Sequence, residues 1–127
     1  MTRRVAGLLL TGVLFTAGGP AFAHHSFAMF DRDNPVELEG IVQEFKLSNP
    51  HTFILLEAKQ KDGSTKVWNL EGMSPSGLVR EGWSSRTLKV GDELKLIIWP
   101  LRSGAPGGAW HIDKINFRDG RPLIEAP

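Results

Sequence analysis

Hydrophobic and polar residues alternate along most of the chain beyond residue 35, in short runs separated by glycine, proline, asparagine and aspartate. A period of two residues is typical of β-strands with one buried face, and such punctuation is typical of turns. One segment departs from this pattern: a Ser-Pro pair opens it and Gly82 closes it, which predicts a short helix. The expected strands are residues 36–47, 52–59, 65–71, the second half of 87–100, and 109–117, with the helix at 76–80.

The first predicted strand changes phase near its middle. Val36 and Leu38 share one parity, whereas Ile41 and Phe45 follow the other, and Gly40 stands at the change. A change of parity beside a glycine is typical of a β-bulge or a sharp strand bend. The sequence therefore predicts a bend or a bulge at Gly40.

Three strands, a short helix and two further strands, with a long and bent first strand, are the element order of the five-stranded OB barrel. We therefore expect an all-β protein with one short helix, folded as an OB-like five-stranded small barrel; an open β-sandwich is the alternative. A chain of 127 residues suffices for one hydrophobic core but not for two. The predicted organisation is a single domain over residues 36–127, preceded by an irregular leader at 24–35 that ends in a turn.

The first residues have a different character. Arg3 and Arg4 are followed by an uncharged apolar stretch at 5–17, a Gly-Gly-Pro break, and an Ala-Phe-Ala sequence that ends at Ala23. These zones predict a cleavable secretory signal peptide over residues 1–23, and hence an exported protein. The apolar stretch is shorter than the roughly 20 residues that a membrane-spanning helix needs, so no membrane span is expected after cleavage. A buried N-terminal helix or a membrane anchor is the alternative.

Several short sequences spread over the chain resemble those of one family of small secreted bacterial proteins. They are HHSFAMFD at 24–31, EGIVQEF at 39–45, SNPH at 48–51, WNLE at 68–71, Ser-Pro at 74–75, Gly-Trp at 82–83, LKVGD at 88–92 and Asp-Gly at 119–120. The family is catalogued as a domain of unknown function, number 6152, and the resemblance covers essentially all of the chain after residue 23. It implies a periplasmic location and a β-barrel-like domain, but no particular activity.

Composition excludes several classes of function. The chain has no cysteine, which excludes disulfides, thiolate catalysis and cysteine metal sites. Without the two arginines of the signal peptide, basic and acidic residues nearly balance, so no nucleic-acid partner is expected. Motifs of serine hydrolases, zinc peptidases and P-loop proteins are absent. The carboxylates Glu71 and Asp92 have no spacing that separates them from ordinary strand-end and turn residues, so we do not expect an enzyme.

The histidines suggest a copper site. Cleavage after Ala23 would make His24 the first residue, and its α-amine and imidazole Nδ1 can then close a chelate ring on one metal ion. A third nitrogen from His25 or His51 would complete tetragonal nitrogen ligation, which favours Cu(II) over zinc. The first hypothesis is therefore a periplasmic copper-binding protein with ligands His24, His25 and His51. In the alternative interpretation, the two adjacent histidines are simply solvated polar residues.

The tryptophans support a second hypothesis of a different class. OB barrels bind their ligands through aromatic side chains on the barrel face. Trp99 and Trp110 flank a Gly/Pro-rich loop at 102–108, and we expect them to form an exposed aromatic pair, whereas Trp68 is expected in the core. On this hypothesis the protein is a non-metal adaptor that binds a periplasmic protein partner or a small ligand through Trp99 and Trp110.

Overall fold

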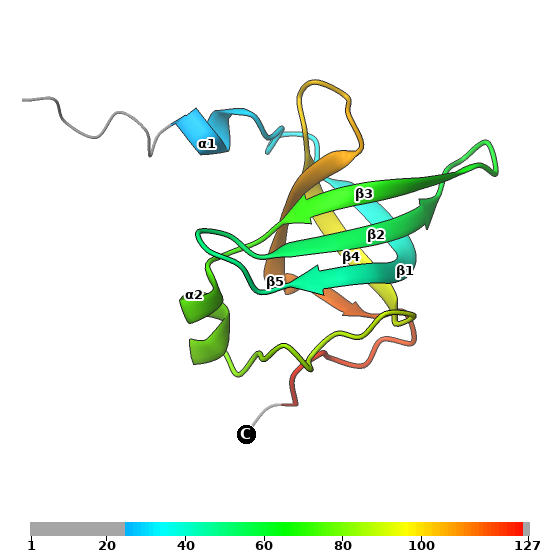
Figure 1. Ribbon diagram of the computed structural model, residues 1–127. Coiled ribbons are helices and arrows are strands. Elements are labelled where there is room, and N and C mark those ends of the chain that lie inside the picture. The colour runs from blue at the N-terminus through cyan, green and yellow to red at the C-terminus, as the bar shows by residue number, and fades with distance from the viewer. Residues whose placement is uncertain (1–24, 126–127) are drawn as a thin grey trace, which may run out of the picture.

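All five predicted strands form, and they close into a single barrel (Figure 1). The computed structural model describes residues 25–125, so the predicted signal peptide and His24 lie outside the described residues. The elements are α1 (His25–Ala28), β1 (Val36–Lys46), β2 (Phe53–Lys59), β3 (Thr65–Glu71), α2 (Pro75–Arg80), β4 (Glu93–Pro100) and β5 (Gly107–Phe117).

Around the barrel the strands follow the order β1-β2-β3-β5-β4, and β4 pairs with β1 to close the ring. The β3–β5 pairing is parallel, and the other four are antiparallel. A closed ring in this order, with α2 between β3 and β4, is the OB-like barrel and not the open sandwich. Over residues 25–125, no helix has the length and apolar character needed to cross a membrane.

The core is built from alternate strand residues, as the hydrophobic pattern predicts. Along β4, the side chains of Leu94, Leu96 and Ile98 are buried, whereas Lys95 and Ile97 between them are exposed. The same alternation runs along β2. Full burial of one aliphatic side chain is worth about 1.5–3 kcal/mol, so these inward rows are the main source of the stability of the barrel.

Helix α2 occupies the segment that the sequence predicts, beginning one residue earlier, at Pro75, and ending at Arg80. The hydroxyl of Ser74 accepts a hydrogen bond from the backbone N–H of Gly77 and caps the helix, and Pro75 takes its first position. The chain leaves the helix at Gly82, whose φ of +84° favours glycine. Leu78 is fully buried and attaches the helix to the core.

The bulge in β1 does not lie at the predicted position. Gly40 pairs in regular register with both β2 and β4, and the register against β2 shifts only between Val42 and Glu44. Ile41 is 40% exposed, so it belongs to the outward row. The prediction was wrong in position because an apolar residue on the outer surface was counted as an inward one.

Gly40 is nonetheless required, for a different reason. Here β1 passes from pairing with β4 to pairing with β2, so both neighbours flank the same residue. A Cβ atom at this residue would overlap the carbonyl oxygen of Glu57 and lie 2.8 Å from Cγ of Leu56. The absent side chain therefore lets β2 approach β1 closely enough for the barrel to close.

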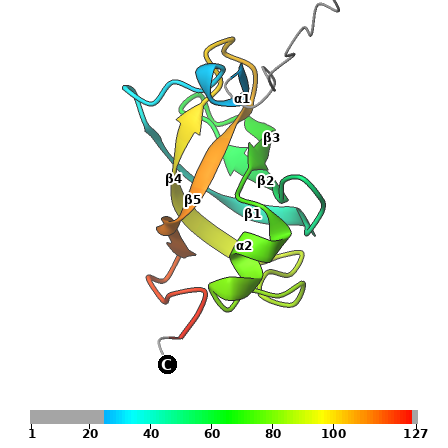
Figure 2. The same ribbon diagram turned by 90° about the vertical axis from the view of Figure 1, so that its left-hand side faces the viewer.

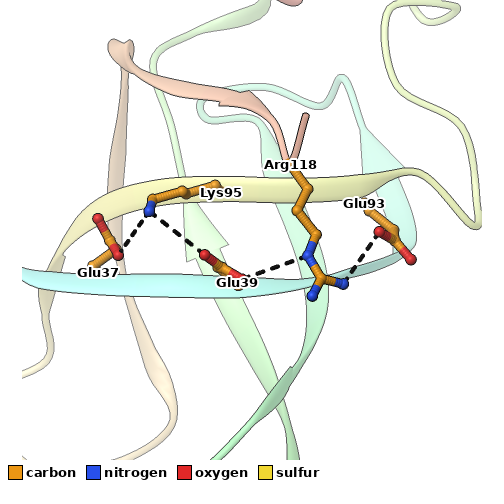
Figure 3. Close-up of polar contacts among 5 residues, drawn as sticks. All are labelled: Glu37, Glu39, Glu93, Lys95 and Arg118. Atoms are coloured by element: carbon orange, nitrogen blue, oxygen red, sulfur yellow. Dashed lines mark hydrogen bonds and ion pairs between the residues drawn. The ribbon is translucent and has the colours of Figure 1, made fainter. Parts of the chain in front are cut away.

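A row of charged side chains crosses the outside of β1 and β4 (Figure 3). Lys95 Nζ lies 3.1 Å from Glu37 Oε1 and 3.5 Å from Glu39 Oε1. Arg118 continues the row, with Nε 3.6 Å from Glu39 Oε2 and Nη1 3.3 Å from Glu93 Oε2. Hydrogen bonding to Glu37 raises the pKa of Lys95. Because these pairs are exposed, they support the register of β1 against β4 more than they stabilise the fold.

The leader is attached to one end of the barrel. The N–H of Asp31 donates to the carbonyl oxygen of Pro100 at 2.8 Å, and the N–H of Arg102 donates to that of Met29 at 2.9 Å. The segment expected to be irregular also contains one helical turn, α1. Figure 2 shows α1 beside the loop between β4 and β5, at the opposite end of the barrel from the C-terminal segment.

Candidate functional site

An apolar pocket of about 330 Å³ lies between the leader and the barrel, at the end that carries α1. A cavity of this size is near the lower limit of pockets that hold small molecules. Its polar lining consists of His51, Glu71, Ser74 and His111. Its large apolar side chains are Phe27, Phe30, Met73, Trp99, Trp110 and Ile112.

The predicted binding pair, Trp99 and Trp110, is brought together on the wall of this pocket. Trp99 is half-buried, and the guanidinium carbon of Arg32 lies 4.6 Å from its ring centroid. Trp110 is not the exposed side chain that was expected: it is 4% exposed, and its ring centroid lies 5.3 Å from that of Trp83. The reason is that the start of β5 runs between β3 and β4, where residues 107–110 are all buried.

Gly72 makes the space that the Trp110 side chain occupies. A Cβ atom at residue 72 would lie 2.5 Å from Cζ2 and 2.6 Å from Nε1 of Trp110, far inside van der Waals contact. The indole therefore packs directly on the backbone at Gly72, with Trp83 also against it. The Nε1 atom is buried and has no hydrogen-bond partner among the described residues. This part of the pocket wall is thus a rigid aromatic surface.

The imidazole of His51 is positioned by the backbone that follows β3. Its Nδ1 lies 3.2 Å from the carbonyl oxygen of Gly72, so in the neutral ring this nitrogen donates the hydrogen bond. Nε2 then carries a lone pair, 3.4 Å from Glu71 Oε1. The next residue, Thr52, holds this backbone segment against the one that follows β3. Its N–H and hydroxyl donate to the carbonyl oxygen of Met73 at 3.1 and 2.9 Å. His51 and Glu71 together form what we call the polar corner of the pocket.

Of the predicted copper ligands His24, His25 and His51, the structure places His51 on the lining of this pocket. His25 is the first residue of α1, and Phe27 of the same helix lines the pocket that contains His51. Among the side chains that the structure describes, those of residues 27–125, no three histidines, aspartates or glutamates lie close enough together to hold a metal ion. Glu71, at the polar corner, adds one oxygen donor beside His51. The copper site stays a prediction, with His24 outside the described residues.

Sequence reasoning missed the pocket residues Phe27 and Met73, and it set aside Glu71 as an ordinary strand-end residue and His111 as an ordinary strand residue. They lie on three segments: α1, the end of β3 and β5. Strands β3 and β5 meet by pairing in the barrel, and the leader brings α1 to them. Hydrophobic periodicity reports which face of a strand is buried, and it does not report which strand ends meet. One usable signal was Gly72, because a glycine at a strand end often marks a close approach by another group.

A five-stranded OB-like barrel with an apolar pocket at one end has the architecture of a small binding module. The chain belongs to the family of unknown function DUF6152, whose model matches residues 12–110. This match confirms the resemblance that the short sequence motifs indicate.

Among solved structures, the chain is similar to the mitochondrial single-stranded DNA-binding protein Rim1 from S. cerevisiae. The two are 11% identical, the match covers 67% of this chain and 93% of that chain, and the TM-score is 0.49. A likeness at this level carries no inference about what this chain binds. No curated protein matches the chain in sequence.

Proposed function

We propose that the protein is an exported small-ligand-binding module, which holds an apolar molecule in the pocket between α1 and the barrel. The observation that carries this proposal is an exposed aromatic side chain on the pocket lining: Phe27 lines the pocket and is 58% exposed. Covering an aromatic side chain of this size is worth up to about 1.5–3 kcal/mol, and a bound ligand would supply the cover. Export is supported by the charged, apolar and Ala-Phe-Ala zones of residues 1–23.

Two further features favour binding in this pocket. Trp110 is held against Gly72 and Trp83, so one wall needs no ordering when a ligand arrives, and preorganisation lowers the cost of binding. The polar corner, His51 and Glu71, supplies the few polar groups that orient a ligand in an otherwise apolar site.

Titration with 1-hexanol, followed by two-dimensional NMR, tests this proposal. The indole N–H signals of the four tryptophans serve as reporters. We expect the signals of Trp99 and Trp110, which line the pocket, to shift and saturate, whereas that of Trp68, which does not line it, stays in place. Shifts that fail to saturate, or that are equal at all four indoles, would contradict binding in the pocket.

Two variants sharpen this measurement. Phe27→Ala should weaken the binding of 1-hexanol about tenfold, because the ligand loses an aromatic surface to cover. Val79→Ala is the matched control: Val79 is 59% exposed, also lies on a short helix and does not line the pocket, so its loss should leave the affinity unchanged. Equal effects of the two substitutions would mean that 1-hexanol binds elsewhere.

Copper binding at the N-terminus is a second candidate function. The observation that favours it is the orientation of His51, whose Nδ1 faces a backbone carbonyl while Nε2 remains available. Metal-binding histidines commonly use the second ring nitrogen in this way. Phe27, three residues after His24 in the sequence, lines the same pocket as His51.

Copper binding can be tested on protein recovered from the periplasm. Its intact mass should correspond to a chain that begins at His24, and a mass that retains residues 1–23 would contradict both export by cleavage and an N-terminal copper site. The cleaved protein should bind Cu(II) more tightly than Zn(II), and His51→Ala should weaken copper binding by about tenfold or more. One extra residue ahead of His24 is the control: unchanged copper affinity in that variant would rule out chelation by the His24 amine.

A further inference from the structure

The polar corner presents two hydrogen-bond acceptors to each other. With its Nδ1 donating to the carbonyl oxygen of Gly72, neutral His51 has only a lone pair at Nε2. The neighbouring atom, Glu71 Oε1 at 3.4 Å, belongs to a carboxylate, which also only accepts. Two acceptors this close need a positive group between them: protonation of Nε2, a metal ion, or a cationic donor group of a ligand.

The charges around the pocket favour a cationic ligand over an anionic one. Among the lining residues that the structure describes, Glu71 is the one carboxylate and none is a lysine or an arginine. The guanidinium of Arg32 lies over the Trp99 ring, but Arg32 is not among the described lining residues. An anionic ligand would therefore find no fixed positive partner, whereas a cation would find a half-buried carboxylate.

We propose that the pocket binds a primary ammonium group carried on an apolar body, with the ammonium at the polar corner and the apolar body against the aromatic wall. This inference rests on the proposed small-ligand function. An ammonium group has three donors and no acceptor, so one such group can donate to both Glu71 Oε1 and His51 Nε2. The apolar body covers Phe27 and Met73, which are both exposed and line the pocket.

The aromatic lining adds to the same preference. Phe30 also lines the pocket, and a cation near an aromatic face is attracted to it. Trp110 contributes packing but no acceptor, because the indole Nε1 only donates. The site therefore recognises the ligand by charge at one end and by apolar contact along the rest.

Hexylamine, 1-hexanol and hexanoate at neutral pH provide a direct test, since they share one apolar chain and differ in the charge of the head group. Binding is followed through the indole signals of Trp99 and Trp110, with EDTA present so that no metal occupies the polar corner. We expect hexylamine to bind about tenfold more tightly than 1-hexanol, and hexanoate to bind most weakly. Equal affinities for hexylamine and 1-hexanol would overturn the ammonium preference, while the binding of 1-hexanol would still support the small-ligand pocket.

Glu71→Gln identifies the source of the preference. It keeps the shape of the side chain and removes the charge, so the ratio of the affinities for hexylamine and 1-hexanol should fall from about ten to about one. Glu57→Gln is the control, because Glu57 is also a half-buried carboxylate on a barrel strand but does not line the pocket. If Glu71→Gln weakens both ligands equally, Glu71 only supports the pocket wall, and the proposal is wrong. If none of the three ligands binds the original protein, it is the small-ligand function itself that fails.

Discussion

Gly40→Val is expected to lower the free energy of unfolding by about 3 kcal/mol, at the upper end of overpacking effects. Most overpacked residues press on side chains that can change rotamer. Here the new Cβ would overlap the carbonyl oxygen of Glu57, which belongs to the backbone of a paired strand. Relief requires β1 and β2 to separate where the barrel changes neighbours, so hydrogen bonds of the ladder are lost as well.

Urea denaturation measures this effect through the transition midpoint at constant slope. Ile41→Val is the matched control, because it changes the adjacent residue, keeps a β-branched side chain and alters only a partly exposed position. We expect the control to stay within about 0.5 kcal/mol of the original protein. A Gly40→Val protein as stable as this control would mean that β2 can retreat from β1 at no cost.

Trp110→Ala should destabilise the protein by about 3–5 kcal/mol, as is typical when a large buried aromatic side chain is removed. The indole fills the space above Gly72 and packs on Trp83, so its removal leaves a cavity inside the core and also takes away one wall of the pocket. Stability and ligand binding should therefore fall together, as urea denaturation and the 1-hexanol titration would show.

The conservative variant Trp110→Phe separates packing from hydrogen bonding. Because Nε1 of Trp110 has no hydrogen-bond partner among the described residues, the phenylalanine side chain should fill less of the core but should lose no hydrogen bond. The expected cost is about 1–2 kcal/mol, well below that of alanine. If phenylalanine proves as damaging as alanine, the N–H group must donate to a partner, such as a bound water, that matters for the fold.

The barrel was predictable because its strands carry their own signals. Leu94, Leu96 and Ile98 alternate with polar or exposed residues, and the Ser74 cap and Gly82 delimit α2 as their chemistry requires. The misplaced bulge in β1 shows the limit of such signals. Ile41 is apolar yet outward, and the pattern alone cannot tell an exposed isoleucine from a buried one.

The candidate site was predictable only in part, because it is assembled from the ends of elements. His51, Trp99 and Trp110 were recognised by their chemistry and do meet at one pocket. The burial of Trp110 depends on Gly72, 38 residues earlier in the chain, and no local pattern connects the two. Glu71 gains its place beside His51 through backbone pairing between the segments before β2 and after β3.

The parallel pairing of β3 with β5, which we call the seam, is a weakly paired part of the barrel. It joins only Asn69 to Gly107, Leu70 to Gly108 and Glu71 to Ala109, whereas β2 and β3 are joined at seven positions. Parallel pairs are also slightly less stable per residue than antiparallel ones. This seam borders the pocket, through Glu71 and Ala109. Local opening of the barrel should therefore begin beside the pocket. A molecule larger than the cavity could enter there while the other strand pairs keep their hydrogen bonds.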